Sequence, residues 1–278
     1  MSSSGRLIVC ATPIGNLGDV TLRVLDALRD ADTVAAEDTR VTRKLLARYE
    51  IDTRLERCDE HTVARQTPAL IERLLGGEVI ALVSDAGTPG VSDPGSRLVD
   101  ACIDAGVTVD VFPGASAILT ALVASGLPTN AFYFGGFLPR KAGERRRALD
   151  ALALLDATLV FYESPHRSAA TLAALAEALP GRDAAMAREL TKMHEEVVRE
   201  PIEQLAVTIS GRENLKGEVV LLIGPPPAPE RQPADATDVR ARVEAFIAEG
   251  VSKSEAVKRI ARDLDLPRSE VYEIAHRA

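Results

Sequence analysis

Short apolar runs alternate with amphipathic stretches along the first 113 residues. The apolar runs predict buried strands, whereas apolar positions repeated every three or four residues, as at Val24, Leu25 and Leu28, predict helices. We expect strands at residues 7–11, 33–36, near 55, 79–84 and 107–112, and helices at residues 21–31, 41–49, 64–75 and 96–105. Because helices separate the strands, the crossovers should be right-handed and the sheet mainly parallel.

A second α/β set follows Pro113. An Ala-rich helix over residues 114–125 comes first. Further strands are expected at residues 131–134, 157–162, 184–187 and 219–223, and helices at residues 167–179 and 202–209. The last strand ends at the prolines of residues 225–229, which cannot continue a hydrogen-bonded ladder and predict a stiff, extended linker.

Three helical segments are expected after this linker, at residues 238–249, 254–264 and 268–277. Ser252 with Glu255, and Pro267 with Ser269, supply helix starts. The size and spacing resemble a helix-turn-helix, but residues 238–278 contain eight basic and eight acidic residues. We therefore favour a compact three-helix accessory over direct contact with nucleic acid.

These patterns predict an α/β protein with two α/β domains and a small all-helical C-terminal segment. The expected N-terminal α/β domain spans residues 1–113, and the C-terminal α/β domain spans residues 114–225. A Pro-rich linker follows over residues 226–237, and the three-helix segment occupies residues 238–278. A chain of 278 residues with 46% hydrophobic content is long enough for several cores.

The cellular compartment is predicted from what the sequence lacks. Neither an apolar run of about 18 residues nor the basic and apolar start of a signal peptide is present, so we expect a cytoplasmic protein without a membrane span. Cys10, Cys58 and Cys102 are odd in number and far apart, which argues against a disulfide framework or a zinc site and predicts buried core residues.

The formal net charge of −8 opposes broad adhesion to nucleic acid, since phosphate binding depends on Lys and Arg. Any RNA contact must therefore be a local basic patch. One candidate patch comprises Arg140, Lys141, Arg145, Arg146 and Arg147. The alternative interpretation of this cluster is a solvated helix start.

Three loops that follow predicted strands carry the candidate chemistry. They are TPIGNLGD at residues 12–19, SDAGTPGVSDPG at residues 84–95 and PGASA at residues 113–117. In an open parallel sheet, ligands bind beyond the carboxyl ends of the strands, and a helix N-terminus there receives anions. Alone, the first loop would be a simple turn before a helix capped by Asp19 or Thr21, but the three loops together describe a ligand site.

The familiar nucleotide and metal sites do not match. The sequence contains no GxxxxGK[ST] motif, and no GxGxxG follows the first strand. The four histidines, His61, His166, His194 and His276, do not fall at metal-ligand spacings, so we expect no metal.

Eight motifs resemble a known family. They are ATPIGNLGDVTLR, AAEDTR, SDAGTPGVSDPG, VFPGASA, GGFLPRK, FYESPHR, RELTKMHEE and KGE. In this order, from about Leu7 to Pro225, they resemble the 16S ribosomal RNA cytidine 2′-O-methyltransferases of the tetrapyrrole-methylase superfamily. Most tetrapyrrole methylases carry GPGD and GGDP where this chain has TPIGNLGD and AGTP, which argues against a tetrapyrrole substrate.

The resemblance implies a class III methyltransferase whose S-adenosylmethionine cofactor lies in the cleft between two α/β domains. It implies transfer of the methyl group to the ribose 2′-hydroxyl of a cytidine in the decoding region of 16S rRNA, within the small ribosomal subunit. It also implies a homodimer. The cofactor-binding residues carried over from the resemblance are Pro13, Ser84, Asp85, Ala86, Gly87, Thr88, Val91, Ser116, Ala117, Glu163, Glu189 and Leu190.

Because this cofactor carries an already activated methyl group, we expect the protein chiefly to align the acceptor oxygen. A base, or a cation that stabilises the developing alkoxide, would add about 10²- to 10⁴-fold. The candidates are Lys192, His194, Glu195 and Glu196, with Asp85 opposite, and we assign the catalytic role to Lys192 and Glu195. A structural ion pair or hydrogen bond is the alternative role for each.

We expect the basic patch, joined by His166 and Arg167, to hold the RNA phosphates. Two rival functions stay open. One is a small-molecule methylase of the same fold, acting for example on a tetrapyrrole, although an aromatic content of 4% offers few stacking surfaces. The other is a non-catalytic RNA-binding ribosome assembly factor that works through the terminal helices.

Overall fold

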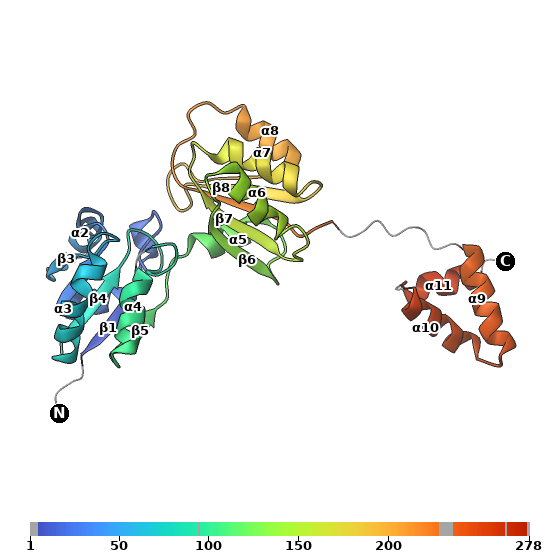
Figure 1. The fold of residues 1–278 in the computed structure, drawn as a ribbon, viewed down its shortest axis with the longest axis horizontal. Coiled ribbons are helices and arrows are strands. Elements are labelled where there is room, and N and C mark those ends of the chain that lie inside the picture. The colour runs from blue at the N-terminus through green and yellow to red at the C-terminus, as the bar shows by residue number, and fades with distance from the viewer. Residues whose placement is uncertain (1–4, 94, 228–235, 265, 277–278) are drawn as a thin grey trace. The chain divides into compact units, whose positions relative to one another are not determined.

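The computed structural model describes residues 5–93, 95–227, 236–264 and 266–276, and the chain divides into two compact units, Met1–Pro227 and Ala228–Ala278 (Figure 1). The first unit contains two five-stranded sheets, and the second contains three helices. No helix in these ranges is long and apolar enough to cross a membrane.

The first sheet is entirely parallel, as predicted. Its strands are β1 (Arg6–Cys10), β2 (Thr33–Ala36), β3 (Leu55–Arg57), β4 (Val79–Val83) and β5 (Thr108–Phe112). They pair in the order β3-β2-β4-β1-β5. The predicted short strand near residue 55 forms the edge.

Helices cover both faces of this sheet (Figure 1). They are α1 (Leu22–Asp30) and α2 (Thr39–Arg48) on one face and α3 (Val63–Leu75) and α4 (Gly95–Asp104) on the other. Successive residues of a strand point to opposite faces, so Ile8 packs with the first pair of helices and Leu7 and Val9 with the second. The three cysteines are buried in these cores, which confirms that prediction.

The strand order creates a place for a ligand between β1 and β4. The chain leaves β1 through α1 toward β2 on one side, and leaves β4 through α4 toward β5 on the other. Adjacent parallel strands whose connections run in opposite directions leave a crevice at their carboxyl ends. The first and second loops begin at this crevice.

The second sheet is mixed. Its strands are β6 (Phe132–Phe137), β7 (Thr158–Glu163), β8 (Asp183–Arg188), β9 (Glu196–Pro201) and β10 (Val219–Ile223), in the order β6-β7-β10-β8-β9. Only the pair β6 and β7 is parallel. Strand β9 was not predicted, because the charges of Glu196, Arg199 and Glu200 interrupt its apolar pattern. Such charges are common on edge strands, where they oppose pairing with other chains.

Two cores lie on the faces of the second sheet. Helices α6 (Ala142–Asp150), α7 (Ser168–Ala178) and α8 (Ile202–Ser210) pack on one face, and α5 (Ala117–Ser125) packs on the other. The α5 core also contains Ile14 from the first loop, packed with Leu190 and the β10 residues Val220 and Leu222. An apolar side chain from the first sheet's crevice is thus anchored on the second sheet.

The second unit consists of α9 (Ala236–Ala248), α10 (Lys253–Asp263) and α11 (Arg268–His276) around a small core of its own. Ser252 caps α10 by accepting a hydrogen bond from the Glu255 N–H, as the sequence predicts. Residues 228–235 of the predicted linker and Arg277 of the last predicted helix lie outside the described residues. The domain boundaries at residues 113 and 225 stay predictions.

Candidate functional site

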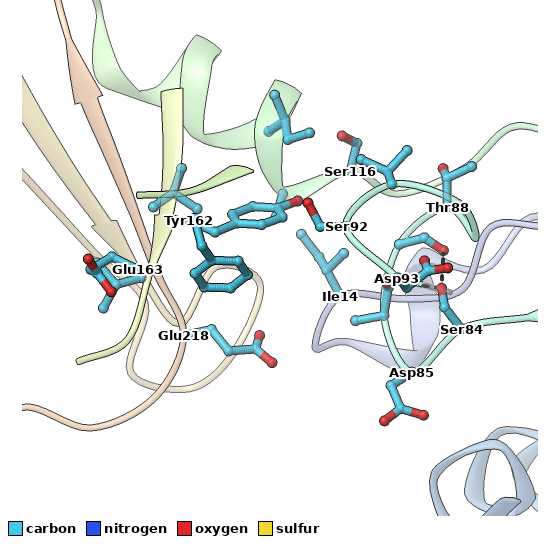
Figure 2. A pocket seen from close by; sticks show the side chains of 18 of the residues that line it. Ile14, Ser84, Asp85, Thr88, Ser92, Asp93, Ser116, Tyr162, Glu163 and Glu218 are labelled. Atoms are coloured by element: carbon cyan, nitrogen blue, oxygen red, sulfur yellow. Dashed lines mark hydrogen bonds between the residues drawn. The ribbon is translucent and has the colours of Figure 1, made fainter. Parts of the chain in front are cut away.

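A cavity of about 490 Å³ opens at the carboxyl ends of β1 and β4, a volume typical of small-molecule sites. We call it the first cavity. Figure 2 shows Ser84, Asp85 and Thr88 of the loop after β4 on one side of it and Tyr162 and Glu218 of the second sheet on the other. Of the predicted cofactor-binding residues, those that line it are Ser84, Asp85, Ala86, Gly87, Thr88, Val91, Ser116, Ala117 and Glu163.

The first and second loops are tied to each other beneath the cavity. The backbone N–H and carbonyl of Thr12 exchange hydrogen bonds with Gly87, at 2.8 and 3.1 Å. The buried Thr12 hydroxyl also donates to the Ser84 carbonyl at 3.0 Å. Gly87 has φ +77°, a left-handed conformation that side chains rarely adopt, so the turn depends on glycine.

The second loop is also braced from within. Asp93 Oδ1 accepts hydrogen bonds from the N–H groups of Gly90 and Gly95, both at 2.7 Å. These bonds close the loop just before α4 begins. The cavity wall is therefore held in shape by the chain itself. Pro94 of this loop lies outside the described residues.

The third loop brings the N-terminus of α5 to the cavity. The Ser116 hydroxyl caps the helix by accepting from the Leu119 N–H at 3.4 Å, so the helix begins at Ala117 and not at residue 114 as predicted. Ser116, Ala117 and Ile118 line the cavity. The first N–H groups of a helix have no intrahelical partner and favour an anionic ligand group such as a carboxylate.

An aromatic wall on the second sheet faces the loops. The Tyr162 ring packs against Phe134 with centroids 5.0 Å apart, and against Phe137 at 5.7 Å. Tyr162 and Phe137 line the cavity, and Phe137 is exposed. This wall offers an apolar aromatic surface suited to contact with a ring such as adenine.

Glu163 lines the cavity, but its carboxylate is engaged elsewhere. It accepts hydrogen bonds from the Thr171 hydroxyl at 2.5 Å and the Ser164 N–H at 2.7 Å, and Arg167 lies 3.4 Å away. The side chain is only 3% exposed. Its bonds fix the junction between β7 and α7, so its contribution to the cavity is mainly structural.

The charge of the first cavity is entirely negative. Its titratable lining includes five carboxyl groups, those of Glu37, Asp85, Asp93, Glu163 and Glu218, and no Lys, Arg or His among the described residues. Burial raises the pKa values of both Asp85 and Glu37, and repulsion from neighbouring carboxylates adds to the rise. Such a lining favours a cationic or zwitterionic ligand and disfavours a phosphate.

A second cavity, of about 380 Å³, adjoins the first and shares part of its wall. The shared residues are Ile14, Ser84, Asp85, Ala86 and Glu218. The remaining wall comes from the first loop, from α2 and from Lys192. Unlike the first cavity, it therefore carries lysines, Lys44 and Lys192.

Lys192 belongs to a strained turn. Glu189 and Thr191 have φ values of +51° and +65°, which non-glycine residues seldom adopt. The Lys192 ammonium lies 2.8 Å from Glu189 Oε1 and 3.0 Å from Glu218 Oε2. Burial alone would lower the pKa of Lys192, but these hydrogen bonds outweigh burial and raise it. Lys192 is therefore a cation at neutral pH and not a base.

Contacts with the first loop hold this turn in place. Thr191 Oγ1 accepts from the Asn16 N–H at 3.0 Å, and Glu195 accepts from the Thr191 N–H at 2.6 Å. Gly217, with φ +91°, lies beside the turn, and a Cβ there would stand 2.4 Å from the Glu189 side chain. The close approach of these two segments therefore requires glycine.

The predicted catalytic residues thus differ in their surroundings. Lys192 faces the second cavity, whereas Glu195 braces the turn and lines neither cavity. His194 is exposed, and Glu196 forms ion pairs with Arg188 and Arg212. Asp85, the candidate on the opposite side, lines both cavities.

Three predicted cofactor-binding residues lie outside the first cavity. Pro13 lines the second cavity, Leu190 is buried in the α5 core, and the Glu189 carboxylate is bonded to Lys192. Whether they contact a cofactor stays a prediction. Their motifs lie at the crevice, but the resemblance does not give the direction of each side chain.

The predicted RNA-binding residues lie on and around α6, and several of their charges are already neutralised. Lys141 pairs with Glu144, and Arg146 pairs with Asp150 and Glu177. Arg145 and Arg167 donate to the carbonyls of Arg140 and Leu138. The side chains of Arg140, Arg147 and His166 are exposed and form no ion pair with a carboxylate of the described chain.

Some lining residues were not predicted. They include Ile14, Glu37, Phe137, Tyr162 and Glu218. All five belong to motifs that carry the family resemblance: ATPIGNLGDVTLR contains Ile14, AAEDTR contains Glu37, GGFLPRK contains Phe137, FYESPHR contains Tyr162, and KGE contains Glu218. Their motifs were thus a usable signal, but no role had been attached to these positions.

Comparison with known proteins agrees with this geometry. The sequence model of the tetrapyrrole (corrin/porphyrin) methylases matches residues 6–206. The chain is 45% identical to the ribosomal RNA small subunit methyltransferase I of Halalkalibacterium halodurans, over 98% of this chain and 95% of that protein. It is 49% identical to the protein of the same name from Mesorhizobium japonicum, over 91% and 86%.

Among solved structures, the fold is similar to a uroporphyrin-III C-methyltransferase from Thermus thermophilus complexed with S-adenyl homocysteine, with a TM-score of 0.57 and 20% identity over 79% of this chain and 97% of that one. The predicted two-sheet fold and the family resemblance are both confirmed. The chain belongs to the tetrapyrrole (corrin/porphyrin) methylase family.

Proposed function

We propose that this protein transfers a methyl group from S-adenosylmethionine to the RNA of the small ribosomal subunit, at the ribose 2′-hydroxyl of a cytidine in the decoding region of 16S rRNA. The support for RNA as acceptor comes from relatives at 45% and 49% identity whose name is ribosomal RNA small subunit methyltransferase I. The motif pattern favours the cytidine ribose. We also propose a cytoplasmic homodimer, on the same resemblance.

The observation that carries the choice of cofactor is the acidic lining of the first cavity. S-adenosylmethionine is a cationic sulfonium with an amino-acid end and an adenosine end. The carboxyl groups of Glu37, Asp85 and Glu218 suit the sulfonium and amino charges, the N-terminus of α5 suits the carboxylate, and the aromatic wall suits the adenine. The residues present therefore fit this cofactor.

When bound, the cofactor supplies a methyl group that is already activated for transfer. The protein's task is then to align the acceptor oxygen and to receive its proton. A base on the protein would accept the hydroxyl proton of the acceptor ribose. We assign this base to Asp85, because it lines both cavities and burial raises its pKa.

Lys192 complements this base. Since its pKa is raised, it serves as a cation that stabilises negative charge on the acceptor oxygen and not as a proton acceptor. Its bonds to Glu189 and Glu218 fix its position. We propose Glu195 as a positioning residue, because its carboxylate holds the turn that carries Lys192.

The test is transfer of tritiated methyl from labelled S-adenosylmethionine to 30S subunits that lack the modification, followed by complete digestion of the RNA. We expect the label in 2′-O-methylcytidine. Cofactor binding without labelled RNA would redirect the search to small-molecule acceptors such as tetrapyrroles. Absence of cofactor binding would refute the methyltransferase assignment for this chain.

A further inference from the structure

Helix α2 forms one wall of the second cavity and is unusually basic. Its ten residues, Thr39–Arg48, include Arg40, Arg43, Lys44 and Arg48 and no carboxylate, in a chain whose net charge is −8. Arg40 pairs with Asp38, just before the helix. Arg43, Lys44 and Arg48 are exposed, and none forms an ion pair with a carboxylate within the described ranges.

The helix keeps these cations on one side. Thr42, Leu45 and Leu46 are buried against the first sheet's core, so the positions between them face away from that core. Arg40, Lys44 and Arg48 are spaced four residues apart and form one stripe. Arg40 is paired with Asp38, but Arg43, Lys44 and Arg48 leave α2 with a cationic surface that forms no ion pair with a carboxylate within the described ranges, in contrast to Lys141 and Arg146 near α6.

The second cavity connects this surface to the first cavity. Lys44, Val41 and Thr42 of α2 line it together with Lys192. Asp85 and Glu218 belong to both cavities, so a group bound in one lies against a group bound in the other. The second cavity therefore borders the acidic first cavity on one side and the cationic helix on the other. This arrangement suits a polyanion that places one of its nucleotides where the two cavities meet.

We propose that the second cavity receives the acceptor nucleotide and that Arg43, Lys44 and Arg48 of α2 bind the phosphates that flank it. This inference rests on the proposed function, because it takes the acceptor to be RNA. It adds the route by which the RNA reaches the first cavity, and it assigns the main phosphate contacts to α2, ahead of the α6 patch.

The first test removes two unpaired charges, in the variant Arg43→Gln/Lys44→Gln. Its matched control is Arg65→Gln/Arg97→Gln, which removes two exposed cations from α3 and α4. For the α2 variant we expect the KM for 30S subunits to rise at least about tenfold and the log–log salt slope of RNA binding to fall by about 1.4 to 1.8. The Kd for S-adenosylmethionine should stay within about twofold of the wild type, and the control should match the wild type in all three.

The second test blocks the compartment itself. Val41 lines the second cavity and is 40% exposed, so Val41→Trp fills space without disturbing the core. Its control is Ile103→Trp on the exposed side of α4, where the side chain is 60% exposed. We expect Val41→Trp to bind S-adenosylmethionine normally and to lose methyl transfer by about 100-fold or more, an effect that a lost positioning contact can reach. Thermal melting establishes that each variant is folded.

The outcomes separate the two proposals. Unlabelled RNA with the wild-type protein would refute the proposed function, and with it this inference. Labelling by the wild type, combined with α2 and Val41 variants that behave like their controls, would overturn the inference alone. A loss of S-adenosylmethionine affinity in the Val41→Trp variant would also overturn it, since the second cavity would then serve the cofactor.

Discussion

The two cavities share a wall but differ in charge and in the elements that build them. The first is formed by loops braced through backbone hydrogen bonds and by an aromatic wall, and its titratable groups are carboxyls. Part of the wall of the second cavity is formed by α2 and by Lys192 of the strained turn, and this wall contains lysines. The charged lining of the first cavity consists of carboxyls, whereas the second cavity combines Lys44 and Lys192 with Asp85 and Glu218. This contrast suits the proposed separation of a cationic donor in the first cavity from an anionic acceptor in the second.

This difference explains how an acidic protein can act on RNA. The carboxylates that repel phosphate surround the first cavity, where no phosphate needs to enter. Arg43, Lys44 and Arg48 are exposed cations on α2, and Lys44 and Lys192 line the second cavity, along which we propose that the phosphate backbone passes. The net charge of −8 therefore says little about RNA binding, because the local distribution decides it.

The largest expected effect comes from Asp85, which the two cavities share. Asp85→Asn keeps the hydrogen bond that Asp85 Oδ1 accepts from the Asp38 N–H at 2.9 Å but cannot accept a proton. We expect kcat to fall about 10²- to 10⁴-fold. The measurement is single-turnover methyl transfer at saturating cofactor and 30S subunits.

Asp100→Asn on α4 is the matched control, since this carboxylate is exposed and lines neither cavity. The wild-type rate should rise with pH through the raised pKa of Asp85, above the usual value of about 3.9, and Asp85→Asn should lose this limb. An unchanged kcat in Asp85→Asn would show that alignment alone is sufficient.

The next effect concerns Lys192, which only the second cavity contains. Lys192→Gln should lower kcat roughly 10- to 100-fold, less than the loss of a fully enclosed oxyanion donor, because water screens part of the charge. Lys192→Arg should retain part of the activity, because it preserves the cation. The acidic limb assigned to Asp85 should survive in both variants.

The readout that separates a reactive role from a structural one is the split between kcat and the cofactor Kd. If Lys192 had only a structural role, both variants would destabilise the turn. Their kcat and their affinity for the cofactor would then fall together with their melting temperatures. If kcat instead falls in Lys192→Gln but is largely kept in Lys192→Arg, while the cofactor Kd of both stays unchanged, the positive charge acts on the reaction. Equal activity of Lys192→Gln and the wild type would remove Lys192 from the chemistry.

A smaller effect distinguishes the α6 patch from α2. Because Arg146 is already paired with Asp150 and Glu177, Arg146→Gln should leave RNA binding almost unchanged. Arg145→Gln/Arg147→Gln should lower the log–log salt slope of RNA binding by less than about 1.4, the smallest fall expected for the α2 variant, with no change in cofactor affinity. If Arg146→Gln alone weakens RNA binding as much as the double variant, its ion pairs must open to meet the RNA.

The fold was predictable where the sequence shows a clear hydrophobic pattern, either a short apolar run or a helical repeat of apolar positions. β2 and β10 match their predicted bounds, since Thr33–Ala36 and Val219–Ile223 are short apolar runs between clear breaks. The crevice was predictable because glycine-containing loops follow β1 and β4. These are local signals, and parallel sheet topology converts them into a site.

The rest depends on tertiary contacts that no local pattern encodes. The edge strand β9 is recognisable only by its pairing with β8. The engagement of the Glu163 carboxylate with Thr171 depends on how α7 packs after β7. The second cavity arises where α2, the first loop and Lys192 meet, three segments that are far apart in the sequence.

The smallest expected effect is on stability, and its sign should differ between the buried carboxyls Glu37 and Asp85 and the Lys192–Glu189 ion pair. Burial raises the pKa values of Asp85 and Glu37 in the folded state. A raised carboxyl pKa contributes stability that is fully present below the unfolded value, about 3.9 for Asp and 4.3 for Glu, and lost as the pH rises through the folded value. Glu37→Gln/Asp85→Asn should therefore melt at a higher temperature than the wild type at pH 7, and this advantage should shrink as the pH falls toward about 4.

For the Lys192–Glu189 pair the effect on stability runs the other way. The hydrogen bond from Lys192 lowers the pKa of Glu189, while the pKa of Lys192 is raised, so this pair stabilises the fold at neutral pH and loses that contribution as acid protonates Glu189. Lys192→Gln should accordingly melt below the wild type at pH 7, and the deficit should narrow in acid. Calorimetric scans of both variants across this pH range measure the contrast. Melting-temperature shifts of the same sign in the two variants would contradict the opposite pKa shifts assigned to the buried carboxyls and to the Lys192–Glu189 pair.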